Sequence, residues 1–182
     1  QTGLALLLSL LMIALAPRGS AQDLVGLYRT WKNDPATTMT VNWVDLYETS
    51  SQTLWYRKKG EAEWRSAEAT RRQAGPSTLQ IRRVELKDLT PDAVYEIGIG
   101  QRPAREIDGW RFRTMPATLS RPIRFVSGGD MMHNRQMVDT MNKQAGALDP
   151  DFALLGGDLA YANGVAASRW VAWRRAVAAA SK

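Results

Sequence analysis

The chain has 182 residues, which is long enough for one large domain or two small ones. Hydrophobic residues make up 45% of it and seven are tryptophan, which argues against wholesale disorder. It has no cysteine and one histidine, which excludes disulfides and thiolate metal sites and limits any site built from imidazole. The net charge of +6 is spread along the chain and indicates affinity for anions only weakly.

The first segment reads as a secretory signal. Residues 4–16 (LALLLSLLMIALA) are all apolar except one serine, too short to span roughly 30 Å of hydrocarbon comfortably but typical of a signal-peptide core. Small residues, Gly19 and Ala21, precede a possible cleavage point after Ala21. We predict that residues 1–21 are a signal peptide cropped at its N-terminus, although an anchoring or buried apolar helix is the alternative. The protein is then secreted or periplasmic, with no stable membrane association after the signal is removed.

Residues 24 to about 115 have the pattern of a β-sandwich. In residues 38–44 (TMTVNWV), Met39, Val41 and Trp43 alternate with polar residues, as in a half-buried strand. Turn residues separate the following segments, and no long helical period occurs. Several short strands between turns predict an all-β sandwich. The further expected strands are 53–59, 79–86, 94–100 and 110–114.

One segment resembles a local feature of fibronectin type III-like sandwiches. In residues 86–97 (LKDLTPDAVYEI), a leucine and a proline turn precede Tyr95 as it enters a strand. This arrangement resembles the tyrosine corner of such sandwiches. Simple packing of Tyr95 in the core is the alternative.

After a proline-containing linker at 115–122, the pattern changes to strand, helix, strand. Residues 123–127 (IRFVS) and 152–156 (FALLG) are apolar strands, and 134–146 is a helix with Met137, Val138 and Met141 on one face. Such a crossover predicts two parallel strands buried on both faces. A second helix is expected at 168–180. Two strands and two helices make a poor closed core, so we expect this second domain to be cut short.

Both apolar strands run into Gly-Gly-Asp, ending at Asp130 and Asp158. Functional groups collect at the carboxyl ends of parallel strands, so the two carboxylates should reach a common point. A bound cation would remove their repulsion, and carboxylate oxygens suit hard divalent or trivalent ions. Tyr161, three residues after Asp158, could reach the same ion. The glycine pairs allow the backbone to approach a ligand closely.

Structural explanations compete with this metal-site hypothesis. A Gly-Gly-Asp sequence can be a capped turn, although two copies on one crossover favour ligands. Tyr161 alone could pack under a loop, and His133 could face solvent. Residues 56–83 interleave basic and aromatic side chains, as nucleic-acid-binding surfaces do. Acidic residues interrupt that run, so we expect no nucleic-acid partner.

The segments 124–131 (RFVSGGDM) and 149–164 (DPDFALLGGDLAYANG), with the preceding sandwich, resemble the purple acid phosphatases of the calcineurin-like metallophosphoesterase superfamily. The resemblance spans about residues 24 to 182. Residues 24–116 look like that family's fibronectin type III-like N-terminal domain. Residues 122–182 look like the N-terminal part of its α/β metallophosphoesterase domain.

The resemblance implies a role for each matching residue. Asp130 corresponds to a ligand of the ferric ion, Asp158 to the carboxylate that bridges two metals, and Tyr161 to the phenolate ligand of the iron. The implied cofactor is a binuclear centre of Fe(III) with zinc, iron or manganese as the divalent ion. The implied substrate is a small phosphomonoester. Met132 stands where related enzymes have a histidine, as in the tyrosine-bearing branch, and no ligand role is carried onto His133.

Other parts of the family pattern are missing from the chain. It contains no Gly-Asn-His-Glu/Asp block and no further histidine motifs. We therefore expect a fragment of a secreted acid phosphatase that is inactive alone, with catalytic residues and remaining ligands beyond Lys182. A phosphodiesterase or nucleotidase of the same superfamily is one alternative. An exported β-sandwich that binds a partner without catalysis is another.

Overall fold

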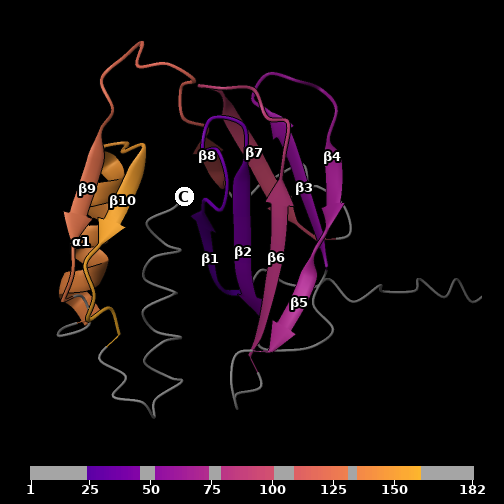
Figure 1. Cartoon of the computed structure of the whole chain (residues 1–182). Helices are drawn as coiled ribbons and strands as arrows, with labels where there is room; N and C mark the ends of the chain where they lie inside the picture. The colour runs from indigo at the N-terminus through magenta and orange to yellow at the C-terminus, as the bar shows by residue number, and fades with distance from the viewer. Residues whose placement is uncertain (1–23, 46–51, 74–78, 101–108, 131–134, 161–182) are drawn as a thin grey trace, which may run out of the picture.

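The computed structural model describes residues 24–45, 52–73, 79–100, 109–130 and 135–160. These residues form a β-rich part followed by a smaller unit of two strands and one helix (Figure 1). The predicted signal peptide and the predicted second helix at 168–180 lie outside the described residues. Among the helices that are described, none is long and apolar enough to cross a membrane.

The β-rich part consists of two four-stranded antiparallel sheets. The first has the order β1-β2-β6-β5, with β1 at Leu24–Thr30, β2 at Met39–Asp45, β6 at Gln80–Leu86 and β5 at Thr70–Gln73. The second has the order β4-β3-β7-β8, with β4 at Arg65–Glu68, β3 at Thr53–Lys58, β7 at Val94–Ile99 and β8 at Arg111–Arg113.

One hydrophobic core joins the two sheets. Trp43 of β2 and Val84 of β6 come from the first sheet, and Leu54 of β3, Tyr95 and Ile97 come from the second. All five are at most 4% exposed. Because apolar side chains of both sheets meet in one cluster, the predicted all-β sandwich is confirmed.

Strand β2 is buried on both faces, whereas its alternating sequence predicted a half-buried strand. Trp43 faces the core as expected, but Thr40 and Asn42 are 1% and 0% exposed. The side chain of Arg83, on the neighbouring β6, donates a hydrogen bond from Nε to Oδ1 of Asn42 (2.9 Å). Since β2 lies between β1 and β6, flanking side chains cover its polar face and satisfy part of its hydrogen bonding.

Tyr95 forms the predicted tyrosine corner. Its ring is 1% exposed and stacks on Phe112, with ring centroids 5.3 Å apart. Its hydroxyl oxygen accepts a hydrogen bond from the backbone N–H of Thr90 (2.9 Å). The phenol therefore fixes the turn between β6 and β7 as well as filling the core.

The second part is a βαβ unit, as predicted. Strand β9 (Phe125–Gly128) and strand β10 (Phe152–Leu155) are parallel, and helix α1 (Arg135–Ala147) connects them. The helix lies beside the strand pair (Figure 1). The linker at 115–122 joins this unit to β8.

Burial in the βαβ unit differs from the prediction. Phe125 and Leu154 are 54% and 52% exposed, so the strands are not buried on both faces. On α1, Val138 is 5% exposed, but Met137 and Met141 are 61% and 62% exposed. Two four-residue strands and one helix do not provide enough surface to bury each other's apolar side chains within the described part of the chain.

We expect the Tyr95→Phe variant to lower the free energy of unfolding by about 1 kcal/mol, because the backbone N–H of Thr90 loses its acceptor. The control is Tyr56→Phe, since Tyr56 is partly buried and its ring face contacts Arg65, whose guanidinium lies 4.7 Å from the ring centroid. That change should stay within about 0.5 kcal/mol. Urea unfolding measures both, and equal small effects would mean that Tyr95 contributes only by packing.

Candidate functional site

The two Gly-Gly-Asp loops lie side by side at the carboxyl ends of β9 and β10. In the parallel register, Leu155 is the partner of Gly128. Pairing then continues beyond the strands, because the N–H of Gly156 donates to the carbonyl of Gly128 (2.7 Å). The N–H of Asp130 likewise donates to the carbonyl of Gly157 (3.2 Å). The structure thus brings together the loops that carry Asp130 and Asp158.

The glycines allow this close approach between the loops. A Cβ atom at Gly129 would lie 3.3 Å from the carbonyl oxygen of Gly157, tighter than ordinary van der Waals contact. Gly157 has a φ of +115°, a conformation that residues with a side chain rarely adopt. The sequence suggested that these glycines let the backbone approach a ligand, and here they let the two loops approach each other.

Asp130 and Asp158 adopt matching left-handed conformations, with φ of 54° and 46°. Aspartate tolerates this region better than most residues with a side chain. Asp88, Asp92 and Asp149 do the same in other turns, so the conformation alone does not distinguish a ligand from a turn residue. Both Asp130 and Asp158 are exposed, so their carboxylates are accessible to a cation or a substrate.

Tyr161, the third predicted ligand, lies outside the described residues. So do His133 and Met132, to which the sequence analysis gave no ligand role. Within the described ranges, no group of three or more His, Cys, Asp or Glu side chains could hold a metal ion. The two aspartates are therefore the part of the predicted ligand set that the structure places, and their role as ligands stays a prediction.

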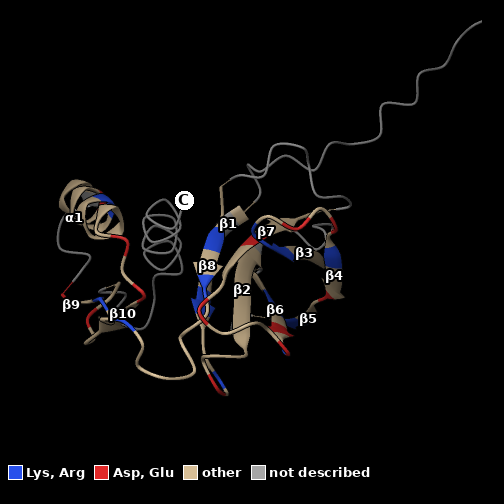
Figure 2. Cartoon of the chain, turned by 90° about the horizontal axis from the view of Figure 1, so that it is seen from above, with Lys and Arg blue, Asp and Glu red and all other residues tan. Residues whose placement is uncertain are grey.

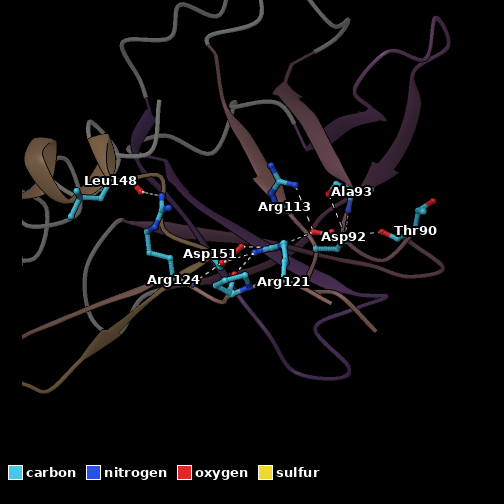
Figure 3. A network of polar contacts seen from close by, with 10 residues as sticks. Thr90, Asp92, Ala93, Arg113, Arg121, Arg124, Leu148 and Asp151 are labelled. Atoms are coloured by element: carbon cyan, nitrogen blue, oxygen red, sulfur yellow. Dashed lines mark hydrogen bonds and ion pairs between the residues drawn. The ribbon is translucent and has the colours of Figure 1, made fainter. Parts of the chain in front are cut away.

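Sequence reasoning missed the contact between Arg121 in the linker and Asp151 at the start of β10. Two nitrogens of Arg121 bind the two carboxylate oxygens of Asp151, at 3.0 and 2.7 Å (Figure 3). An aspartate directly before an apolar strand and an arginine next to a linker proline were visible in the sequence. Their pairing was not, because the two residues are separated by a strand and a helix.

Two arginines in residues 56–83 pack against aromatic rings of the same segment. Basic residues occur on strands of both sheets, with acidic residues among them (Figure 2). The guanidinium of Arg57 lies 4.6 Å from the ring centre of Trp64 and 2.7 Å from Glu96, and Arg65 lies over Tyr56. These ring faces are in contact with arginine, which is a structural explanation of the pattern. The expectation that no nucleic acid binds stays a prediction.

Comparison with known families identifies the β-rich part. The model of the purple acid phosphatase N-terminal domain matches residues 25–114. These residues are a purple acid phosphatase N-terminal domain. The match covers strands β1 to β8 and ends before β9, so the Gly-Gly-Asp loops lie outside it. No curated protein matched the chain.

The purple acid phosphatases are a family of hydrolases that generally use a binuclear metal centre. The family resemblance seen in the sequence is therefore confirmed for this domain. The match to that family is confined to residues 25–114.

The close pairing of the loops predicts different effects for two neighbouring glycines. Gly157→Ala should cost about 1–3 kcal/mol of local stability, because alanine at a φ of +115° is strained. Gly156→Ala is the matched control, since its Cβ would meet the carbonyl of Gly128 at an ordinary 3.6 Å. Hydrogen exchange of the Asp130 amide, which is bonded to Gly157, measures the difference. Faster exchange in Gly156→Ala than in Gly157→Ala would contradict it.

Proposed function

We propose that residues 122–182 are the N-terminal part of a metallophosphoesterase domain belonging to a secreted or periplasmic acid phosphatase. In this proposal, Asp130, Asp158 and Tyr161 bind a binuclear centre of Fe(III) with zinc, iron or manganese, and the substrate is a small phosphomonoester. One observation carries the proposal. The same chain that contains a purple acid phosphatase N-terminal domain continues into two aspartate-bearing loops held side by side.

The chemistry of the two loops fits metal ions. Asp130 and Asp158 provide exposed carboxylates, which are ligands that hard cations prefer. Two like charges held in adjacent loops repel each other, and a cation between them offsets this repulsion. A Cβ atom added at Gly128 or Gly157 would meet no other atom of the described residues within 4 Å. When bound, a pair of metal ions neutralises phosphate charge and lowers the pKa of water.

Further ligands are needed to complete such a centre. The sequence contains one histidine and no Gly-Asn-His motif. We propose that the asparagine and histidine ligands implied by the family resemblance come from outside these 182 residues. The role of this chain is then to supply the first carboxylates and the phenol.

The 182-residue chain, supplied with Fe(III) and Zn(II), should not hydrolyse p-nitrophenyl phosphate, whereas the chain extended by its downstream coding sequence should. In the extended protein, Asp158→Asn should lower kcat by about 100-fold or more, because metal-based charge stabilisation is lost. Asp149→Asn is the matched control, since Asp149 is also exposed with a φ of 47° but lies in the turn before β10. Activity of the unextended chain, or equal effects of the two variants, would contradict the proposal.

The assignment of Tyr161 has a spectroscopic test that does not depend on activity. A phenolate bound to Fe(III) absorbs visible light, so the extended, iron-loaded protein should be coloured. Tyr161→Phe should lose that absorption band while keeping the fold. An unchanged band in the variant would mean that Tyr161 is not a ligand.

A further inference from the structure

The purple acid phosphatase N-terminal domain contacts the βαβ unit through an arginine of the linker. Arg121 donates from Nη1 and Nη2 to both carboxylate oxygens of Asp151, and from Nε to Oδ1 of Asp92 at 2.9 Å (Figure 3). Asp92 belongs to the turn before β7, and Asp151 directly precedes β10. One side chain therefore bridges the two parts of the protein.

The carboxylate of Asp151 is well suited to hold this bridge. Its side chain is 7% exposed, and Arg121 is 28% exposed. Asp151 also accepts a hydrogen bond from the backbone N–H of Arg124 (2.9 Å) and donates its own N–H to the carbonyl of Arg124 (2.8 Å). A two-pronged arginine–carboxylate pair of this kind fixes orientation as well as distance.

A second contact is made by Phe152, the first residue of β10. Trp31, which packs on the sandwich core, meets Phe152 edge to face with ring centroids 5.8 Å apart. Phe152 in turn stacks on Phe125 of β9 at 5.4 Å. The apolar contact thus continues from the sandwich core through β10 to β9, independently of the arginine.

We propose that the purple acid phosphatase N-terminal domain orders the β9–β10 strand pair. Arg121 is the positioning residue, and Trp31 provides a second, apolar contact. Both contacts are made at the start of β10, by Asp151 just before the strand and by Phe152, its first residue. Asp158 lies beyond the far end of the same strand. The domain that carries none of the candidate ligands thereby determines where one of them is held.

The βαβ unit depends on such stabilising contacts. A sheet of two four-residue strands is marginally stable by itself, and its apolar side chains are largely exposed within the described chain. Ordering β10 at its first residues holds the whole strand in register, because its pairing with β9 begins at Phe152 and Phe125. This proposal concerns order in the strands and holds whether or not the loops bind a metal ion.

Arg121→Met in the full 182-residue chain should raise hydrogen exchange of residues 125–128 and 152–156 by about ten- to a hundredfold. Exchange of the sandwich strands 39–45 and 94–99 should change less than about twofold. Arg121→Lys should give a smaller effect in the same segments, because lysine keeps the charge but not the two-pronged geometry. The matched control is Arg113→Met, since Arg113 approaches Asp92 at 3.6 Å without a hydrogen bond to Asp151.

A pH profile separates the ion pair from simple packing. The hydrogen bonds from Arg121 hold the pKa of Asp151 below its usual range, the backbone N–H of Arg124 and the charge of Arg113 act in the same direction, and partial burial opposes them. Arg121 stays charged, because its pKa is raised by Asp151 and Asp92. The ion pair of Asp151 therefore contributes its full stability when the pH is above the pKa of Asp151 in the unfolded chain, about 3.9. This contribution is lost as the pH falls through the lowered pKa of Asp151 in the folded chain.

Protection factors of residues 152–156, corrected for intrinsic exchange, should thus exceed those of Asp151→Asn from pH 7 down to about 4. The difference should shrink below about pH 4 and disappear once the pH is below the lowered pKa of Asp151. Unchanged exchange in both Arg121→Met and Asp151→Asn would overturn the proposal. An equal rise in the sandwich strands would overturn it too, because Arg121 would then support the whole fold. A pH-independent difference would assign the effect to packing and reject the ion pair.

Discussion

The parallel pairing of β9 with β10 is the constraint on which the candidate site depends. Four residue pairs set the register, and the hydrogen bond from Gly156 to Gly128 carries it into the loops. The bond from Asp130 to Gly157 then fixes the second loop against the first. A slip of one residue would break both bonds and separate the aspartates. Two loops that are separated in the sequence by a helix thus lie side by side because their backbones are paired.

This pairing is too short to stand alone, which gives the sandwich its importance. The purple acid phosphatase N-terminal domain has its own core around Trp43 and Tyr95, and it reaches the strand pair through Arg121 and Trp31. Both contacts converge on the start of β10. The well-packed sandwich therefore stabilises the marginally stable βαβ unit through contacts at the start of β10, the strand that leads to Asp158. A domain without candidate ligands can in this way be necessary for a site that it does not line.

Much of the fold could be predicted because the relevant signals are local. Alternation and turn residues predicted the sandwich, and the proline turn before Tyr95 indicated a tyrosine corner, in which the structure shows a hydrogen bond to Thr90. Apolar strands on either side of one helical pattern predicted the parallel pair. The burial of individual strand faces was harder to predict, because it depends on which other parts of the protein pack against each face. The polar face of β2 is covered although its sequence looked half exposed, and β9 and β10 are exposed although theirs looked buried.

The sequence by itself determined the candidate ligands, because the repeated Gly-Gly-Asp pattern marks Asp130 and Asp158. It also determined the β-sandwich class and the parallel pairing of the two later strands. Tertiary structure alone decided that the two loops share backbone hydrogen bonds, since that requires both strands in one register. It also decided that Arg121 meets Asp151 and that Trp31 meets Phe152. The physical reason is that periodicity and turn chemistry act over a few residues. Contacts between separate elements depend instead on how those elements pack, and no local pattern encodes that.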